Sequence, residues 1–581
     1  MATLEEKRHT LAHLLASAVL ERYPHAKATI GPAIDNGFYY DFDFSGGAVP
    51  GEADLALLEE AMREMLPSWK DMTGTEVSEK DAKDRFAGNP YKLEIISEIG
   101  AKNEPITLYT AGGFTDLCRG GHSDNPAKEI AADSFALDRV AGAYWRGDEK
   151  NPMLTRIYGL AFETGEELAA YRTQQEEAKK RDHRKLGKEL GLFTFSELVG
   201  AGLPLFTPKG TVLRDKIHEF SQELRTKRGF DRVWIPHVTK TDLYKTSGHW
   251  AKFGDELFLV KSQETSDEFV LKPMNCPHHT QIYASEPRSY RDLPLRFLET
   301  TTVYRDEKKG ELAGLSRVRA ITQDDSHVFC RPDQIEEECR SIMEMVTEFY
   351  TVVGMKFRAR LSFRDAKTPD KYLGEESLWN TAQEKLEAIA KSGGFEYFVA
   401  EGEAAFYGPK IDFMATDAIG REHQLATCQL DFVQPSRFGL TFNDADGAEK
   451  MPVMIHLAIA GSLERFLSVY IEHTAGNFPV WLAPLQVRIL PVSEKHAAYA
   501  HEILASLKEA GVRAEVDDAN ESLGKKIRNA KTSKIPYVLV LGDQEMTDKT
   551  VTVESRDAGK VGAMSVSDFL AKASEEIKNR S

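Results

Sequence analysis

Residues 304–327 carry the densest group of side chains that could do chemistry. They lie between two β-branched runs, which a polar, glycine-containing segment (residues 308–314) separates. This pattern predicts a long β-hairpin with charge on its inner face. Guanidinium groups bind phosphate bidentately, so arginines at the mouth of such a hairpin, followed by carboxylates and a histidine, could hold a polyphosphate and a small cationic group. On this stretch alone, a solvated charged hairpin is the simpler interpretation. The residues concerned are Arg305, Glu307, Arg317, Arg319, Gln323, Asp324, Asp325 and His327.

Two segments remote in sequence favour a functional site. KPMNCPHH at residues 272–279 supplies Cys276, and MIHLAIAGSLERF at residues 454–466 supplies His456 and Arg465. With them, the chain resembles the class II aminoacyl-tRNA synthetases, and among these the threonyl-tRNA synthetases, from about Arg8 to near the C-terminus. Motifs 2, 3 and 1 of that class are matched by Arg305-x-Glu307 with Arg317, Ile321 and Asp325, by Gly461-Ser-Leu-Glu-Arg465, and by Gly229 to Pro236.

The resemblance assigns roles to individual residues. It implies Mg²⁺ with ATP and one Zn²⁺ per subunit, whose ligands are far apart in sequence, so spacing alone does not indicate them. The implied zinc ligands are Cys276, His327 and His456. The implied catalytic residues are Arg305, Glu307, Lys410 and Arg465. The implied ATP-binding residues are Arg305, Arg317, Ile321, Gln429 and Arg465. The implied threonine-binding residues are Gln323, Asp325 and Tyr407.

The implied reaction is ATP-dependent ligation of L-threonine to tRNA(Thr) through a threonyl-adenylate. Three protein ligands leave positions open on zinc, which the amino nitrogen and hydroxyl of threonine can fill and valine cannot. A site built for a hydroxyl rejects an analogue lacking it by about 10⁴–10⁵, whereas one missing methyl is worth only about 1–3 kcal/mol. Serine is therefore attached in error, which calls for a second, hydrolytic site for Ser-tRNA(Thr).

Two pairs of residues near the N-terminus supply candidates for that second site. Two histidines lie four residues apart on a helix predicted at residues 5–23, and Cys118 and His122 are four apart in TDLCRGGH. One such pair is more often accidental than functional, but two pairs in one domain-sized segment favour a site. The pattern resembles the editing domain of threonyl- and alanyl-tRNA synthetases, which works without metal in the threonyl branch. The candidate editing residues are His9, His13, Lys92, Asp116, Cys118 and His122.

The secondary-structure pattern and the resemblance predict a multidomain α+β protein. Its core is a class II antiparallel sheet (residues 191–482), preceded by an α+β editing domain (1–162) and a charged helix without a clear core face that bridges two domains (163–190). Toward the C-terminus strands alternate with helices, which predicts a partly parallel α/β sheet resembling an anticodon-binding domain (483–581). The family usually begins with a TGS domain, which this chain lacks.

A strand, a helix and a second strand are expected between Leu205 and Pro236. The last strand is predicted at residues 233–236, where a proline tolerates only the edge or the end of a sheet. In class II enzymes this region forms the dimer interface, so the resemblance implies a homodimer.

The composition limits the partners and the compartment. The 581 residues carry 74 basic and 91 acidic side chains, a net charge of −17, which argues against indiscriminate nucleic-acid binding. A tRNA must then be held by local basic patches, and residues 179–188 and 525–534 are candidates, although a solvated helix face explains each equally well. Five scattered cysteines suit a reducing cytoplasm. No apolar run approaches the roughly 20 residues that cross a bilayer.

Four residues depart from the family pattern. Ile321 stands where a phenylalanine stacks on adenine, Ala320 and His278 replace glycines, and Leu457 replaces an arginine. All four are expected to crowd the active site and to alter the nucleotide contacts. They favour an alternative, a non-catalytic or regulatory RNA-binding paralogue, which the retained zinc ligands and arginines oppose. A zinc hydrolase lacks support, because the sequence has no His-Glu-x-x-His motif.

Overall fold

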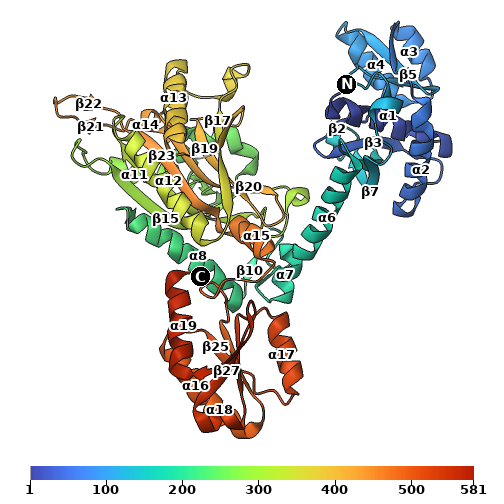
Figure 1. Ribbon diagram of the computed structural model, residues 1–581. Coiled ribbons are helices and arrows are strands. Elements are labelled where there is room, and N and C mark those ends of the chain that lie inside the picture. The colour runs from blue at the N-terminus through green and yellow to red at the C-terminus, as the bar shows by residue number, and fades with distance from the viewer. Residues whose placement is uncertain (1, 395) are drawn as a thin grey trace. The chain divides into compact units, whose positions relative to one another are not determined.

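The structure, a computed structural model, describes residues 2–394 and 396–581. It divides into two compact units, Met1–Glu176 and Glu177–Ser581, each of which is described by itself (elements labelled in Figure 1). Among the described helices, none combines the length and the apolar character needed to cross a membrane.

The first unit is built on an antiparallel sheet of order β1-β3-β8-β7, with β2 paired to β3, and a smaller sheet of order β4-β5-β6. Helix α1 packs against β3, and its start is fixed by reciprocal capping between Thr3 and Glu6. The helices are α1 (Leu4–Arg22), α2 (Leu55–Met65), α3 (Glu79–Arg85), α4 (Pro90–Ala101) and α5 (Pro126–Glu129). The strands are β1 (Lys27–Ala28), β2 (Ala33–Ile34), β3 (Gly37–Asp43), β4 (Thr73–Val77), β5 (Ile106–Ala111), β6 (Phe114–Leu117), β7 (Phe135–Tyr144) and β8 (Met153–Ala161).

The segment predicted as one bridging helix is two helices, α6 (Gly165–Arg181) and α7 (His183–Glu189). Asp182 separates them because its carboxylate caps α7, accepting a hydrogen bond from Arg184 N at 2.8 Å. The expectation that this segment lacks a core face is wrong for α7, whose His183 and Leu186 are buried.

The second unit is organised by an eight-stranded sheet of order β11-β15-β16-β23-β20-β19-β17-β18. Only the two outermost pairs are parallel, so the predicted antiparallel core is confirmed. Helices α8, α12, α13 and α15 pack with the strands into one apolar core. The strands are β11 (Asp231–Arg232), β15 (Leu295–Tyr304), β16 (Ala320–Cys330), β17 (Lys356–Phe363), β18 (Tyr397–Glu401), β19 (Lys410–Thr416), β20 (Glu422–Asp431) and β23 (Val453–Ser462). The helices are α8 (Pro208–Thr226), α11 (Cys276–Ala284), α12 (Ile335–Val352), α13 (Glu376–Ser392) and α15 (Leu463–Thr474).

Strands β15 and β16 form the predicted hairpin. They pair from Leu295↔Phe329 to Tyr304↔Ala320, and residues 305–319 connect them. Successive side chains of a strand point to opposite faces. The predicted site residues at positions 321, 323, 325 and 327 therefore share one face of β16. The side chains of residues 322, 324 and 326 are buried on the other face.

The same alternation corrects one expectation about the departures from the family pattern. On β23, His456 and Ala458 share a face, and Ala458 lines a cavity described below. Leu457 points to the opposite face, where it is 1% exposed within the main apolar core. Leu457 therefore does not crowd the active site.

The short strand predicted at residues 233–236 lies earlier in the sequence than expected. It is β11, which ends at Arg232 rather than spanning residues 233–236. Val233 N still donates to Leu298 O, but Ile235 N donates to the Glu299 carboxylate at 3.0 Å. Because a side chain takes this N–H and Pro236 has none, regular pairing cannot continue.

The C-terminal part of the second unit confirms the predicted partly parallel sheet. Its order is β25-β24-β26-β27-β28, in which β24 is parallel to both neighbours and the remaining pairs are antiparallel. The strands are β24 (Val487–Pro491), β25 (Ala514–Val516), β26 (Tyr537–Leu541), β27 (Thr550–Ser555) and β28 (Gly559–Ser565). The helices are α16 (Ala497–Glu509), α17 (Leu523–Thr532), α18 (Asp543–Asp548) and α19 (Val566–Asn579).

The basic residues at positions 525–534, on and after α17, do not form the free cationic face that a tRNA-binding patch requires. Lys526 is buried, and its ammonium donates to Asp517 O at 2.7 Å. Lys531 forms an ion pair with Glu554 at 2.6 Å. The ion pair reduces the net positive charge at Lys531 and burial removes Lys526 from the surface, so both contribute less to a patch for tRNA.

Candidate functional site

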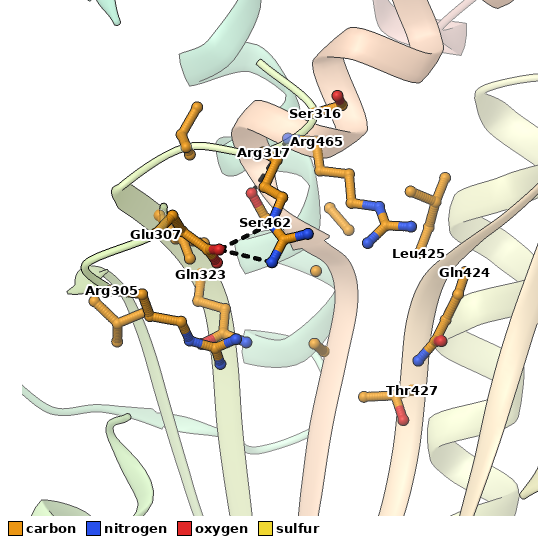
Figure 2. A pocket seen from close by; sticks show the side chains of 16 residues that line it. Arg305, Glu307, Ser316, Arg317, Gln323, Gln424, Leu425, Thr427, Ser462 and Arg465 are labelled. Carbon is orange, nitrogen blue, oxygen red and sulfur yellow. Dashed lines mark hydrogen bonds and ion pairs between the residues drawn. The ribbon is translucent and has the colours of Figure 1, made fainter. Parts of the chain in front are cut away.

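A cavity of about 470 Å³ lies over the hairpin of β15 and β16. Three arginines from two segments reach it: Arg305 and Arg317 from the connection between the strands, and Arg465 from the first turn of α15 (Figure 2). The Glu307 carboxylate accepts a hydrogen bond from Arg317 Nε at 2.8 Å. Several guanidinium groups around one hollow suit a polyphosphate, because each can bind two phosphate oxygens.

Strand β20 completes this cavity with residues that the sequence did not indicate. Gln424, Leu425 and Thr427 line it. Gly461, on β23 and within the motif already identified, lines the cavity beside them. Gly461 has a φ of +69°, and an added Cβ would lie 2.4 Å from Leu425 O, so only glycine fits there. Thr427 could have been found from the sequence, because it lies two residues before the predicted Gln429 and therefore on the same face of the strand.

The predicted ATP-site residues do not all meet in this cavity. Ile321 and Gln323 line it, but Lys410 and Gln429 are not among the described residues that do. Lys410 forms an ion pair with the fully buried Asp412. Gln429 Oε1 accepts a hydrogen bond from Tyr407 at 3.2 Å and pairs in register with His456, so it belongs to the neighbouring group of residues.

That neighbouring group contains the predicted zinc ligands. Cys276, His327 and His456 are buried, and their donor atoms lie within 4.8 Å of one another. Cys276 opens α11, while His327 and His456 are register partners on β16 and β23, with His327 Nε2 3.0 Å from His456 Nδ1. The fold thus brings together three residues that are 51 and 129 positions apart in sequence (327 minus 276, and 456 minus 327).

In each of the two histidines, the ring nitrogen that is not turned toward the other histidine has a hydrogen-bonding neighbour, as is usual for metal-binding histidines. His456 Nε2 lies 2.9 Å from Asp431 Oδ2, and His327 Nδ1 lies 2.7 Å from His279 Nδ1. Burial raises the pKa of the Cys276 thiol and lowers the pKa of His327. One thiol and two imidazoles, oriented by a carboxylate and a third imidazole, fit Zn²⁺.

Of the predicted threonine-binding residues, Gln323 lines the cavity, while Asp325 and Tyr407 lie beside the histidines of this group. Asp325 accepts a hydrogen bond from Asn275 at 3.0 Å, and the Tyr407 ring is centred 5.1 Å from that of His456. The buried Gln323 Oε1 has no hydrogen-bond partner among the described residues. His278 also has two unpartnered ring nitrogens within the described part of the chain, for which we have no structural account.

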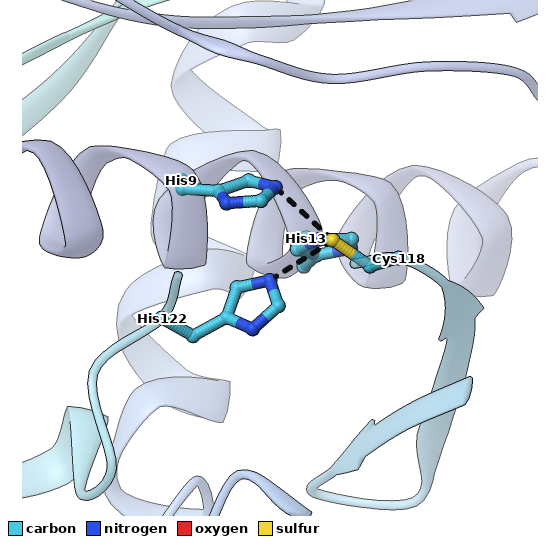
Figure 3. A group of neighbouring side chains, drawn as sticks. All are labelled: His9, His13, Cys118 and His122. Carbon is cyan, nitrogen blue, oxygen red and sulfur yellow. Dashed lines mark hydrogen bonds between the residues drawn. The ribbon is translucent and has the colours of Figure 1, made fainter. Parts of the chain in front are cut away.

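In the first unit, histidines surround Cys118 (Figure 3). Cys118 Sγ lies 3.4 Å from His9 Nε2 and 3.3 Å from His122 Nε2, and the His13 ring is centred 5.1 Å from that of His9. Burial raises the pKa of Cys118, but hydrogen bonds to His122, His13 and His9 outweigh burial and lower that pKa to about 3. The group is therefore a thiolate at neutral pH.

Asp116 on β6 contacts the cationic side chains beside the same group, Lys92 and His13. Its carboxylate lies 2.5 Å from Lys92 Nζ and 3.1 Å from His13 Nδ1, and it accepts a hydrogen bond from Tyr40 at 2.5 Å. Burial lowers the pKa of His13, but hydrogen bonds to Asp116 and Cys118 outweigh burial and raise that pKa to about 9. Tyr40, on β3, is a residue that the sequence analysis missed.

A cavity of about 390 Å³ opens on this group. Five of the six predicted editing residues are among the described residues that line it, and His122 contacts Cys118 without being one of them. The donor atoms of His9, His13, Cys118 and His122 lie within 4.8 Å of one another, close enough to hold a cation. That this group works without metal stays a prediction.

Comparison with known families first defines the class of protein. Residues 258–474 match the class II core domain of tRNA synthetases (G, H, P, S and T), and residues 486–576 match an anticodon binding domain. The arginine-lined cavity and its antiparallel sheet thus form a class II tRNA synthetase core.

Individual relatives then identify the family. The chain is 48% identical to a threonine–tRNA ligase of Gloeobacter violaceus, over 99% of this chain and 93% of that protein. It is 47% identical to that of Thermus thermophilus, over 99% of this chain and 88% of that protein. The chain belongs to the threonine–tRNA ligase family.

Solved structures agree with that assignment. The RNA binding domain of threonyl-tRNA synthetase from Cryptosporidium parvum is 37% identical, with a TM-score of 0.65, and the match covers 68% of this chain and 98% of that one. A putative threonyl-tRNA synthetase of Aeropyrum pernix is 28% identical, with a TM-score of 0.61, and the match covers 69% and 96% of the two chains.

Proposed function

We propose that this chain ligates L-threonine to tRNA(Thr) with ATP, through a threonyl-adenylate, and hydrolyses mischarged Ser-tRNA(Thr) in its N-terminal unit. The observation that carries the ligase proposal is the juxtaposition of an arginine-lined cavity with a Cys-His-His donor set, in a chain of the threonine–tRNA ligase family. A non-catalytic RNA-binding paralogue is not favoured, because such a protein would need neither feature.

Adenylate formation requires positioning and charge neutralisation. The threonine carboxylate attacks the α-phosphorus, and pyrophosphate leaves; Mg²⁺ bound with ATP would neutralise part of its charge. Arg305 neutralises the α-phosphate and Arg465 the γ-phosphate, while Glu307 orients Arg317 toward the nucleotide. Lys410, paired with Asp412, acts as a positioning residue. A ribose hydroxyl of the tRNA then attacks the threonyl carbonyl, and AMP leaves.

Recognition of threonine uses the neighbouring group. Zn²⁺ bound by Cys276, His327 and His456 would supply Lewis-acid positions for the amino nitrogen and the hydroxyl of the substrate. Asp325 accepts a hydrogen bond from one of these groups, and the unpartnered Gln323 Oε1 accepts from the other.

Editing uses the Cys118 group. His9 Nδ1 lies 3.1 Å from Gly121 O and its Nε2 lies 3.4 Å from Cys118 Sγ, so His9 fixes the Cys118 thiolate, which accepts a proton from the attacking water. The water attacks the seryl ester carbonyl, and the ribose oxygen leaves with a proton. Lys92 and His13, held by Asp116, stabilise the negative charge that develops on the carbonyl oxygen.

The ligase proposal is tested by amino-acid-dependent ATP–pyrophosphate exchange across a panel of amino acids. We expect exchange with threonine, weaker exchange with serine, and none above background with valine. Absence of exchange with every amino acid on the panel, from folded protein, would exclude the proposal and favour the paralogue.

ATP affinity offers a test of the substitution at position 321. Ile321 lines the cavity opposite its register partner Val303, and an aromatic ring there would add stacking worth about 1–3 kcal/mol per base. Ile321→Phe should lower the KM for ATP by about 5- to 150-fold. Steady-state exchange kinetics measure it, with Ile321→Leu as the control of similar volume. An unchanged or raised KM in the phenylalanine variant would show that adenine is held elsewhere.

We further propose a homodimer formed through the edge of the eight-stranded sheet at β11. The adjacent Trp234 is 77% exposed, which is unusual for so large an apolar side chain, and tryptophan often anchors protein interfaces.

Trp234→Glu should convert the dimer into a monomer, because a carboxylate would be buried without a partner. Sedimentation velocity measures the mass, with Met153→Glu, at another exposed apolar position, as the control. A Trp234→Glu protein that still sediments as a dimer would place the interface elsewhere.

The expected domain limits of 1–162, 163–190, 191–482 and 483–581 are retained as part of this proposal. Only the boundary between residues 482 and 483 has support from the family matches, which end at residue 474 and begin again at residue 486. A cytoplasmic location is proposed as well, since Cys118 and Cys276, both free cysteines, must stay reduced to act.

A further inference from the structure

Helix α7 contributes a buried histidine that the proposed reaction does not use. His183 belongs to the basic run at residues 179–188, which the sequence analysis offered as a tRNA patch. Its imidazole is 6% exposed and makes two hydrogen bonds in opposite directions. Nδ1 lies 2.7 Å from Glu472 Oε1, and Nε2 accepts from Leu315 N at 3.1 Å. Nε2 must therefore be the unprotonated nitrogen, and Nδ1 donates to the carboxylate.

The two partners of His183 belong to the two segments that carry arginines into the ATP cavity. Leu315 lies in the connection between β15 and β16, two residues before Arg317, and the intervening Ser316 lines the cavity. Glu472 lies in the last turn of α15, whose first turn carries Arg465. His183 thus joins the connection to the helix.

Glu472 is itself fixed in place. Its second oxygen accepts a hydrogen bond from Arg421 at 2.6 Å, and Arg421 precedes the cavity-lining part of β20. Burial raises the pKa of Glu472, but hydrogen bonds from His183 and Arg421 outweigh burial and lower that pKa. A charged carboxylate between two donors is a rigid anchor, because charge-assisted hydrogen bonds are the stronger ones.

The connection needs this anchor because its tip bonds mainly to itself. Arg317 N and Ser316 Oγ both donate to Ala313 O, which closes a small turn. Gly314 has a φ of +54°, and an added Cβ would lie 2.3 Å from His183 Nε2, so the ring fills the space that glycine leaves. The turn and the imidazole are fitted to each other.

We propose that His183 is a positioning residue for the ATP site: it pins the turn at Leu315 to Glu472 on α15 and so holds Arg317 and Arg465 in one arrangement for the nucleotide. The inference rests on the proposed binding of ATP in this cavity. It also makes α7, part of the segment after the N-terminal unit, a determinant of nucleotide affinity.

Two substitutions separate the two bonds of the ring. His183→Asn keeps a donor at the Nδ1 position but cannot reach Leu315 N, whose N–H is then buried without a partner. His183→Gln places a carbonyl oxygen near the Nε2 position and can still accept that N–H, while the backbone N of residue 183, which donates to Glu472 Oε1 at 3.1 Å, keeps the link to α15. A bond lost in this way is worth roughly tenfold in an equilibrium constant. His183→Asn should therefore raise the KM for ATP about tenfold with little change in kcat or in the KM for threonine, and His183→Gln should restore most of it.

The matched control is His496, which directly precedes α16 in the C-terminal part of the second unit. It is also buried and bridges two groups, Ser493 N at 3.1 Å and Asp543 Oδ1 at 2.9 Å. Melting temperature and ATP–pyrophosphate exchange are measured for His183→Asn, His183→Gln, His496→Asn and the unsubstituted chain. If the unsubstituted chain shows no threonine-dependent exchange, the proposed function fails. If the unsubstituted chain does show this exchange, two results overturn the positioning role. One is an unchanged KM for ATP in His183→Asn; the other is a change in kcat, in both KM values and in melting temperature like that of His496→Asn.

Discussion

Purified Cys276→Ala protein should contain less than about a tenth of the zinc of the unsubstituted chain and should lose threonine-dependent pyrophosphate exchange at least about 100-fold. The expectation follows from the donor set: two imidazoles without the thiolate leave zinc with too few protein ligands, and even indirect supports of a metal ligand are worth about 10–100-fold in affinity or activity. Metal analysis and exchange kinetics on the same sample measure both effects, and the unsubstituted chain should hold about one zinc per subunit.

Two other cysteines make this experiment specific. Cys330 is buried at the end of β16, three residues from His327, and Cys330→Ala should keep zinc and activity. Cys118→Ala tests the metal-free editing site, because zinc content should not change there either. Unchanged zinc and activity in Cys276→Ala would overturn the proposed metal site, and a loss of zinc in Cys118→Ala would show that the editing group binds metal.

The second large effect concerns fidelity. His9→Ala combined with His13→Ala should slow hydrolysis of Ser-tRNA(Thr) by about 10²–10⁴-fold, since that is the usual contribution of a positioned acid–base group. Charging with threonine should stay within a few-fold of the original rate, because these residues belong to the first unit and the ATP cavity belongs to the second. Deacylation of preformed Ser-tRNA(Thr) and the initial rate of threonine charging are the two measurements.

Controls are needed because His13 is 3% exposed and its removal could unfold the first unit. The single change His9→Ala spares the buried contacts and should retain most of the defect, while His25→Ala, in the same unit, should have none. Deacylation at the original rate in the double variant would exclude the hydrolytic role. Parallel loss of threonine charging would show instead that the two units do not act separately.

The sequence predicted those parts of the fold that depend on local patterns. The hairpin of β15 and β16, the N-terminal helix and the alternating elements of the C-terminal sheet follow from side-chain periodicity, which short segments carry by themselves. One error occurred where a side chain far away in sequence intervenes, since Glu299 takes the N–H of Ile235 and ends β11 early. The other is local, because the carboxylate of Asp182, within the predicted bridging helix, caps α7 and divides that helix.

For the sites, the sequence by itself determined the residue types, and the motifs around Arg305, Arg465 and Cys276 indicated the family that the comparisons show. Only the tertiary structure decided which residues meet. It separated Lys410 and Gln429 from the arginine-lined cavity, placed Leu457 in the core, and added Tyr40 and His183. The physical reason is that strand alternation fixes the face of each side chain, whereas the partner across a sheet or a helix is set by register and packing between segments more than a hundred residues apart.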